Sequence, residues 1–249
     1  MKYFSADWHI NSTNILKYAH RPFKTAEEAF RALVTNASYC IKGDGMLYHV
    51  GDLILSGKDR HDKVVDESIG LSIDDIKTNV RANMFLLAGN HDENNGCTAD
   101  AKYLVLDLNR KYQNVFVGHY PSYNTMNYRG PNSCINLCGH VHNSWLMYYD
   151  WHKRVLNINV GVDVWNYMPA SDEQICKMLD FVYANWTKFI SHYTFSWTRK
   201  DYDKYAKEIE AENEKLRQLR KKEKYEKKGL APEECKRRKI AAMKAKGLI

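Results

Sequence analysis

Five short apolar runs, each ending in a block of Gly, Asp, Asn or His, constrain the fold of this chain more than any other feature. The central run is Met84–Ala88, which predicts a buried strand and is followed directly by Gly89-Asn90-His91-Asp92. An amide, an imidazole and a carboxylate therefore emerge together where a strand ends. In open α/β sheets, ligands bind at the carboxyl ends of the strands. The pattern predicts an α/β fold with a polar site at one edge of a sheet.

The other four blocks repeat this arrangement. In chain order the five blocks are Asp7-Trp8-His9, Gly51-Asp52, Gly89-Asn90-His91-Asp92, Gly118-His119 and Gly139-His140-Val141-His142. Taken alone, a Gly next to a polar residue mostly marks a turn, and a His-x-His sequence is only a strand with two imidazoles on one face. Five such blocks in order, each closing a strand-like run, instead indicate a shared site built from carboxylates and imidazoles.

Local signals predict the elements around these blocks. A capping box at Thr25 and Glu28 predicts a helix start, as does Ser171-Asp172-Glu173, and a helix is expected over 72–81. The segment Lys102–Lys111 is ambiguous between strand and helix. Strands are expected at Met1–Ala6, Met46–Val50, Met84–Ala88, Asn114–Val117, Ile135–Cys138 and Val155–Val160.

In set, order and spacing, the five blocks resemble the calcineurin-like metallophosphoesterase superfamily. The resemblance covers roughly residues 1–175 and extends to Asn14-Ile15, Arg21-Pro22-Phe23, His119-Tyr120-Pro121 and Asn159–Trp165, which are similar to a small branch found in bacteria and tailed phages. It implies an α/β fold in which two mixed β-sheets pack as a sandwich flanked by helices, with the site at one edge.

The resemblance also implies the metal ligands. Two sets of side chains are expected to hold one divalent ion each: Asp7, His9, Asp52 and His142, and Asp52, Asn90, His119 and His140. Asp52 is suited to bridging, because two cations about 3.5–4 Å apart repel each other and need a shared anionic ligand. Nitrogen and oxygen ligands without thiolate favour manganese, with iron, zinc or nickel as alternatives.

The resemblance also implies that His91 and Asp92 are the catalytic residues. A hydroxide activated by the two metals would attack phosphorus, while His91 stabilises phosphoryl charge and protonates the departing oxygen. Asp92 would orient His91 through a hydrogen bond. Asn90 and Arg21 are expected to contact the substrate, Arg21 as a planar clamp on two phosphate oxygens. An arginine in a surface turn explains Arg21 equally well.

Ser12 departs from the branch, whose members have a second histidine at this position. Because Ser12 is not an expected ligand, hydrolysis should persist. Substrate contacts near this loop are expected to differ, so the specificity of the branch does not carry over.

The expected function is that of a metal-dependent phosphoric ester hydrolase, most readily a phosphodiesterase acting on a nucleotide or nucleic acid. The motifs do not separate this activity from a phosphomonoesterase or a protein phosphatase, because the metals contact only the phosphoryl group. A catalytically silent nucleic-acid-binding protein is the third alternative. It would tolerate the loss of Asp7, Asn90, His91 or His140, and all four are present.

Charge divides the chain into two parts. The segment 198–249 holds 18 Lys and Arg residues against 10 Asp and Glu, whereas the rest holds 19 against 20. This asymmetry predicts a catalytic domain over 1–197 and a charged, mainly helical extension over 198–249. Its last run, Lys236–Lys246, has six bases and no acid and is the expected contact for nucleic acid. A solvated helix with paired Lys and Glu side chains is the plainer explanation for Asp201–Lys228.

The expected location is the cytoplasm, or the host cytoplasm if a phage encodes the chain. No run of about 18 apolar residues is present, and Asp7 falls where a signal peptide needs an apolar core. No membrane partner is expected, since no strong apolar face accompanies the basic charge. The sequence leaves the oligomeric state open.

Overall fold

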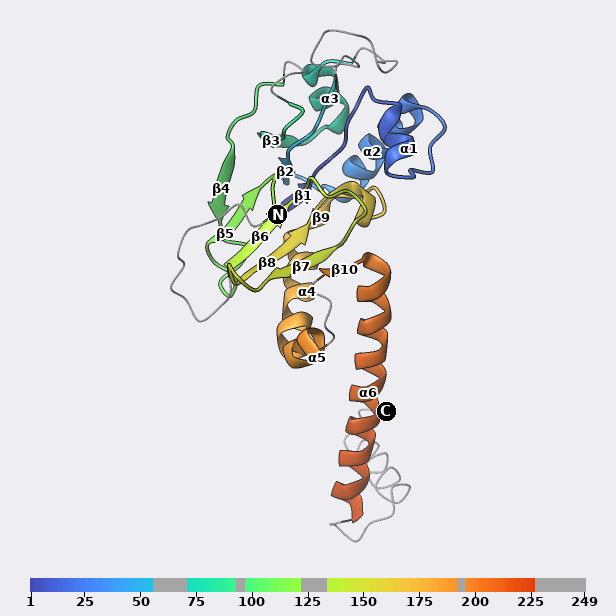
Figure 1. Cartoon of the computed structure of the whole chain (residues 1–249), viewed down its shortest axis with the longest axis vertical. Helices are drawn as coiled ribbons and strands as arrows, with labels where there is room; N and C mark the ends of the chain where they lie inside the picture. The colour runs from blue at the N-terminus through green and yellow to red at the C-terminus, as the bar shows by residue number, and fades with distance from the viewer. Residues whose placement is uncertain (56–70, 93–96, 122–133, 192–195, 227–249) are drawn as a thin grey trace, which may run out of the picture. The chain divides into compact units, whose positions relative to one another are not determined.

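The computed structural model describes residues 1–55, 71–92, 97–121, 134–191 and 196–226 (Figure 1). The chain divides into two compact units, Met1–Lys200 and Asp201–Ile249, whereas the predicted boundary lay between Trp197 and Thr198. Among the described residues, no helix combines the length and the apolar character that crossing a membrane requires.

The first sheet is mixed. Its strands, in the described part of the chain, lie in the order β3-β2-β1-β9, with the bounds β1 (Lys2–Ser5), β2 (Met46–Val50), β3 (Asn83–Leu87) and β9 (Ala170–Ser171). Strands β1, β2 and β3 run parallel, and β9 pairs with β1 antiparallel. The carboxyl ends of β1, β2 and β3 therefore meet at one edge.

The second sheet is also mixed. Its described strands lie in the order β10-β7-β8-β6-β5-β4, with the bounds β4 (Tyr103–Leu106), β5 (Val115–Gly118), β6 (Cys134–Cys138), β7 (Met147–Asp150), β8 (Val155–Asn159) and β10 (Ser196–Trp197). Strands β5, β6 and β8 run parallel, while β4, β7 and β10 are antiparallel to their neighbours. Two mixed sheets flanked by helices confirm the predicted fold class.

The helices have the bounds α1 (Asn14–Tyr18), α2 (Ala26–Cys40), α3 (Ile73–Val80), α4 (Asp172–Ala184), α5 (Trp186–Ser191) and α6 (Arg199–Glu226), with a short 3-10 helix η2 (Val162–Val164). The helices α2, α3 and α4 begin where the sequence predicts them, whereas α1 and α5 were not predicted. Thr25 caps α2 by accepting a hydrogen bond from the Glu28 amide, and Ser72 and Ser171 form capping boxes at α3 and α4.

The apolar faces of α2 and α3 join the first sheet in one core cluster. Leu33 and Ala37 of α2 and Ile76 of α3 lie in it together with Leu47 of β2 and Leu86 of β3. Burial of these side chains supplies most of the free energy that holds a two-layer fold together. This packing fixes the positions of the strand ends that carry the polar blocks.

The expected strands are all present, and the ambiguous segment Lys102–Lys111 contains β4. Tyr103 pairs with Gly118 across β4 and β5, so strand pairing decides what the local pattern left open. Strands β7, β9 and β10 were not predicted. Strands β9 and β10 are each two residues long. They count as strands because they pair with β1 and β7, respectively.

Contacts just beyond the strand ends join the parallel strands of the first sheet to those of the second. A parallel bridge joins Ala6, after β1, to Gly161, after β8. The amide of His140, after β6, donates to both carboxylate oxygens of Asp7, after β1, at 3.0 Å. The polar blocks of both sheets are therefore tied together at one place.

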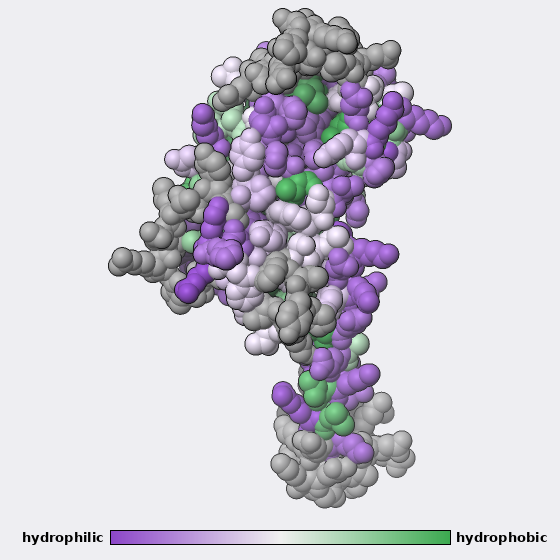
Figure 2. All heavy atoms as spheres, in the orientation of Figure 1, coloured by the Kyte–Doolittle hydropathy of each residue, from purple (hydrophilic) through white to green (hydrophobic). Residues whose placement is uncertain are grey.

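The surface gives no sign of a broad apolar patch on the face that Figure 2 shows. Hydrophilic and near-neutral side chains cover most of the described surface in this view, and hydrophobic ones form small separate spots. Within α6, Leu216 and Leu219 are exposed. The basic run Lys236–Lys246 lies outside the described residues.

Candidate metal centre

The strand ends bring two groups of ligand-type side chains together. Each group offers one ligand atom per residue, within 4.8 Å of one another, and the groups are Asp7, His9 and His142, and Asp52, His119 and His140. Asp7 and His9 follow β1 of the first sheet, and His140 and His142 follow β6 of the second. Neither sheet alone would make either site.

Asp52 stands between the two groups. Its Oδ2 atom lies 3.6 Å from Nε2 of His9 and 3.3 Å from Nε2 of His119. Its Oδ1 atom accepts a hydrogen bond from the backbone amide of His91 at 2.9 Å. One carboxylate oxygen thus faces one imidazole from each group, which is the arrangement that a bridging ligand requires.

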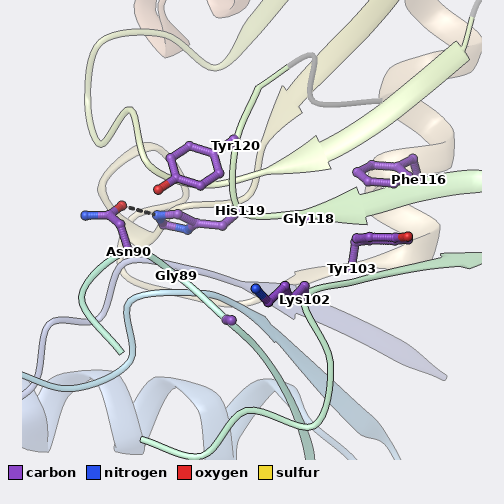
Figure 3. A pocket seen from close by; sticks show the side chains of 9 residues that line it. Gly89, Asn90, Lys102, Tyr103, Phe116, Gly118, His119 and Tyr120 are labelled. Atoms are coloured by element: carbon purple, nitrogen blue, oxygen red, sulfur yellow. Dashed lines mark hydrogen bonds between the residues drawn. The ribbon is translucent and has the colours of Figure 1, made fainter. Parts of the chain in front are cut away.

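Asn90 joins the second group. Its Oδ1 atom lies 3.0 Å from Nε2 of His119 and 3.0 Å from Nδ1 of His140. Figure 3 shows the Asn90 side chain directed at His119. An amide oxygen and two ring nitrogens converge there, so the carboxamide contributes a neutral oxygen donor.

Hydrogen bonds on the far side of two histidines fix which nitrogen faces the centre. Nδ1 of His119 lies 2.9 Å from the carbonyl oxygen of Val50, and Nδ1 of His142 lies 3.1 Å from Oδ2 of Asp163. With Nδ1–H donating in both, Nε2 is left to bind an ion. Partners of this kind orient metal-binding imidazoles and raise their basicity.

Arg21 is not available as the phosphate clamp that the sequence suggested. The side chain is buried, and Nε donates to Asp163 at 2.7 Å while NH2 donates to the same carboxylate at 3.1 Å. NH1 and NH2 also donate to the carbonyls of Trp8 (2.9 Å) and Asp7 (2.6 Å). A buried guanidinium needs such partners, because an unpaired charge in the interior is costly. Arg21 instead holds Asp163 and the loop after β1.

Asp92 also has a different role from the one that the sequence predicted. Its buried carboxylate accepts hydrogen bonds from the amides of Asp52 (2.8 Å), Leu53 (2.9 Å) and Gly89 (2.8 Å). Among the described residues, no hydrogen bond joins it to His91. Asp92 therefore ties the loop after β2 to the loop after β3, and this replaces the predicted role of orienting His91.

His91 lies on the open side of the centre. Its side chain is exposed, and its ring packs edge-on against His9 with the centroids 5.3 Å apart. An exposed imidazole next to the ligands is accessible to solvent and to a bound molecule. Ser12, in the loop after β1, is buried, and its hydroxyl accepts a hydrogen bond from the Ile15 amide.

Five ligand residues have a left-handed backbone. The φ angles are 59° at Asp7, 48° at His9, 56° at Asp52, 72° at His140 and 47° at His142. Such conformations cost non-glycine residues about 1–3 kcal/mol each and persist where the surrounding structure enforces them, often at functional sites. Their concentration at one place is independent support for a functional centre.

Glycine is required where the loops approach most closely. A Cβ atom on Gly89 would lie 2.1 Å from Oδ1 of Asp52 and 2.3 Å from its backbone nitrogen. A Cβ atom on Gly51 would lie 2.4 Å from Nδ1 of His119. The glycines in the sequence blocks therefore make room for the ligands beside them.

Burial and charge set the protonation of the first group. Burial raises the pKa of Asp7 to about 6, against the opposing effects of His119 and His142. Burial lowers the pKa of His9 well below its ordinary value, so this imidazole is neutral at physiological pH. A neutral, buried imidazole has a lone pair for a metal ion.

The pair of Asp52 and His119 behaves differently. Burial would raise the pKa of Asp52, but the hydrogen bond with His119 and the charge of His119 lower it. Burial would lower the pKa of His119, but Asp52 and Asp7 raise it to about 9. The negative charge of Asp52 and Asp7 that raises the pKa of His119 would also favour a bound cation.

These residues fit divalent metal ions. Both ring nitrogens of His9 are buried, and neither has a hydrogen-bond partner. Buried polar atoms without partners are costly, and a coordinated ion would satisfy one of them. The donors are imidazole nitrogens and carboxylate or amide oxygens, a set that suits manganese, iron, zinc or nickel.

Comparison with known proteins shows relatives of unassigned function. The uncharacterized protein MJ1445 of Methanocaldococcus jannaschii is 30% identical to this chain over 179 residues, which cover 72% of the chain and 90% of that protein. The chain belongs to the same family as this archaeal protein. No model of a known protein family matches the chain.

Two solved structures resemble this chain. A protein of unknown function, AQ665 from Aquifex aeolicus, has 23% identity and a TM-score of 0.48, and the match covers 72% of this chain and 98% of that one. A conserved uncharacterized protein of Streptococcus pneumoniae TIGR4, a predicted phosphoesterase, has 13% identity and a TM-score of 0.31, covering 64% and 71%. These comparisons assign no reaction to this chain, so the reaction must be inferred from the residues of the site.

The sequence did not predict two parts of the site in this family member. One is Asp163, whose pairing with His142 joins residues 21 positions apart. The other is a pocket of about 210 Å³ beside Asn90 and His119, to which Lys102, Tyr103 and Tyr120 contribute (Figure 3). The position of Tyr120 directly after His119 was the one local signal for this pocket.

Proposed function

We propose that this protein is a metal-dependent phosphoesterase of the calcineurin-like type, and that its two ligand groups bind two divalent ions, most readily manganese. The observation that carries the proposal is the position of Asp52 Oδ2, 3.6 Å from a His9 nitrogen and 3.3 Å from a His119 nitrogen. A carboxylate shared between two nitrogen-rich groups is the arrangement that holds two cations close together.

Two divalent ions there would lower the pKa of a bound water and neutralise charge on phosphoryl oxygens. The chain's own residues do the rest. Asp7, His9, Asp52 and His142 would hold one ion, and Asp52, Asn90, His119 and His140 the other. Asp163 keeps Nε2 of His142 directed at the centre, and Val50 does the same for His119.

His91 is proposed as the general acid. Its exposed ring stands beside His9, where it can hydrogen bond to an oxygen of a bound phosphoester and give a proton to the departing one. The hydrogen bond from its backbone amide to Asp52 fixes the residue at the centre.

A phosphodiester is the proposed substrate type, because a diester has a second substituent that must be accommodated. The pocket beside Asn90 and His119 offers space for it. The basic run Lys236–Lys246 remains a proposed contact to nucleic acid. A phosphomonoesterase is the alternative that the following experiment separates.

The test compares hydrolysis of bis-p-nitrophenyl phosphate and p-nitrophenyl phosphate, after chelator treatment and again after addition of manganese. We expect activity only with metal, preference for the diester, and two bound ions per chain. Asp52→Asn should lower both manganese content and turnover, whereas Asp44→Asn, in an exposed turn, should change neither. Preference for the monoester would make the protein a phosphomonoesterase. Absence of turnover of either ester, with two ions bound, would contradict the proposal.

A further inference from the structure

The pocket beside the metal centre has a polar end and an aromatic end. Asn90 and His119 line it at one end, and Tyr103 and Phe116 line it at the other (Figure 3). Its volume is about 210 Å³. Sites for drug-sized ligands run from about 300 to 1,000 Å³, so this pocket suits a smaller ligand.

The aromatic end is preformed. The rings of Tyr103 and Phe116 stack with their centroids 5.3 Å apart and an angle of 26° between their planes. Phe116 is buried, whereas 48% of Tyr103 is exposed. Tyr103 therefore has a supported ring with free surface, which is what stacking against a flat ligand requires.

Gly118 keeps this end open. It pairs with Tyr103 across β4 and β5, and it lines the pocket. A Cβ atom there would lie 2.9 Å from Cε1 of Phe116 and 3.3 Å from Cβ of Tyr103. Any side chain at this position would enter the space between the aromatic end and His119.

Tyr120 forms a wall at the polar end. Its ring lies 4.8 Å from that of His140 and 5.2 Å from that of His119, and 38% of the residue is exposed. Tyr120, His119 and Tyr103 line the same pocket. The pocket is therefore continuous with the proposed position of the phosphoryl group.

The two ends of the pocket are joined at Gly118, which pairs with Tyr103 and directly precedes His119. A nucleotide carries an anionic phosphate and a flat base on one ribose. It can therefore place its phosphorus at the metal centre and its base on Tyr103.

The charge of the lining agrees with such a ligand. Lys102 contributes an ammonium group, and among the described lining residues none is acidic. A lysine next to aromatic faces attracts a ligand that combines anionic phosphate with a π system.

We propose that this pocket binds the nucleoside of a nucleotide phosphodiester whose phosphorus lies at the metal centre, with the base on Tyr103 and Lys102 beside the phosphate. This proposal rests on the proposed function and names its substrate class. In the reaction, water adds to phosphorus, the bond from phosphorus to the other ester oxygen breaks, and the departing oxygen takes a proton. The nucleoside monophosphate stays in the pocket until release.

The test uses two diesters with the same leaving group: thymidine 5′-p-nitrophenyl phosphate and methyl p-nitrophenyl phosphate. Manganese-loaded protein should favour the thymidine ester in kcat/KM by about 5- to 150-fold, the range that stacking of one base supplies. Tyr103→Ala should bring this ratio close to one. Tyr39→Ala, which removes an exposed tyrosine of α2 outside the pocket, should leave the ratio unchanged.

A second readout needs no turnover. Thymidine 5′-monophosphate should bind to chelator-treated protein in equilibrium dialysis, and Tyr103→Ala should weaken this binding about fivefold or more while Tyr39→Ala does not. Lys102→Met should also weaken it and reduce its dependence on salt.

The outcomes separate the two proposals. If the methyl ester is hydrolysed but the thymidine ester is not preferred, or if Tyr103→Ala leaves the preference intact, the nucleoside pocket is wrong and the phosphoesterase stands. If neither ester is hydrolysed by protein that holds two ions, the phosphoesterase is wrong. Binding of the monophosphate through Tyr103 would then still support the pocket as a nucleotide site, and its absence would overturn it.

Discussion

At the scale of single residues, the chemistry of the centre depends on what lies behind each ligand. His142 is backed by Asp163, Asp163 by Arg21, and Arg21 by the carbonyls of Trp8 and Asp7. Burial would raise the pKa of Asp163, but the hydrogen bonds with His142 and Arg21 lower it, so it stays an anion. One ion pair thus orients a ligand of the first group and holds the loop that carries two others.

Replacing Arg21 tests this chain of contacts. Arg21→Met leaves Asp163 buried without its cation, and we expect the free energy of unfolding to fall by about 3–5 kcal/mol, with weaker manganese binding. Chemical denaturation and metal titration measure these effects. Arg31→Met, which breaks an exposed pair with Glu27, should cost at most about 1 kcal/mol. A higher KM with unchanged stability would instead restore Arg21 as a phosphate clamp.

The role of His91 is tested by His91→Ala. The backbone amide that bonds to Asp52 remains, so manganese content should not change. Turnover should fall by about 10²- to 10⁴-fold for an alkyl leaving group and less for p-nitrophenol, which departs without protonation. The exposed residue His152 provides the control, since His152→Ala should alter neither quantity. Loss of metal from the His91 variant would show that the side chain is a ligand.

Metal binding should depend on pH with a defined sign. Metal ligands bind only when deprotonated, so protons and ions compete for the centre. The pKa of about 9 for His119 predicts that manganese affinity rises about tenfold per pH unit from pH 6 to 9 and then levels off. Below pH 6 protonation of Asp7, whose pKa is about 6, should steepen the dependence. Titration of metal-free protein at several pH values measures the slope; a flat profile would contradict the assigned protonation of His119.

At the scale of elements, the loops after the parallel strands decide the site. In the loops after β1, β2 and β6, ligand residues have positive φ, as Asp7, Asp52 and His140 show. Asp92 joins two of these loops through three backbone amides. The glycines beside the ligands and the carboxylate of Asp92 therefore act together to hold the strained backbone of these loops in place.

Gly89→Ala tests the close approach of these loops. The added Cβ atom would lie 2.1 Å from Oδ1 of Asp52, so the loop must move and Asp52 with it. We expect manganese affinity to fall by at least about tenfold, as for changes that disturb ligand orientation. Gly43→Ala is the matched control: Gly43 has a φ of 58° but an added Cβ atom meets nothing within 4 Å. It should cost about 1–2 kcal/mol of stability and leave manganese binding unchanged.

At the scale of the whole molecule, the unit Met1–Lys200 contains both ligand groups and the pocket. Its last residues belong to its packing: the guanidinium of Arg199 lies 5.3 Å from the centre of the Trp165 ring, and NH1 donates to the carbonyl of Val164 at 3.4 Å. A boundary after Lys200 therefore preserves contacts that a boundary after Trp197 would remove.

Two truncations test this boundary. A chain ending at Lys200 should bind manganese and hydrolyse a small diester as the full chain does. A chain ending at Trp197 should do the same but unfold more easily, by about 0.5–1 kcal/mol for the lost cation–π contact. Thermal unfolding and steady-state kinetics measure both. Loss of hydrolysis in the chain ending at Lys200 would show that residues 201–249 belong to the catalytic unit.

Features coded by neighbouring residues were predicted well from the sequence. The strands with polar blocks, the helix starts at Thr25 and Ser171, and the position of carboxylates and histidines at strand ends all arise from local patterns. The reason is that a short apolar run specifies a strand, a hydroxyl specifies a cap, and the end of a parallel strand has a defined place in a sheet.

Features that depend on contacts distant in the sequence were decided by the tertiary structure alone. Arg21 and Asp163 are 142 positions apart in the sequence but form a buried ion pair, so Arg21 is not a phosphate clamp. Asp92 accepts hydrogen bonds from three backbone amides. Tyr103 of β4 pairs with Gly118 and stacks on Phe116, both of β5. The sequence by itself determined which groups could bind metal. Packing determined which of the other polar and aromatic groups were free to meet a substrate, because burial and hydrogen-bond satisfaction are properties of the folded chain as a whole.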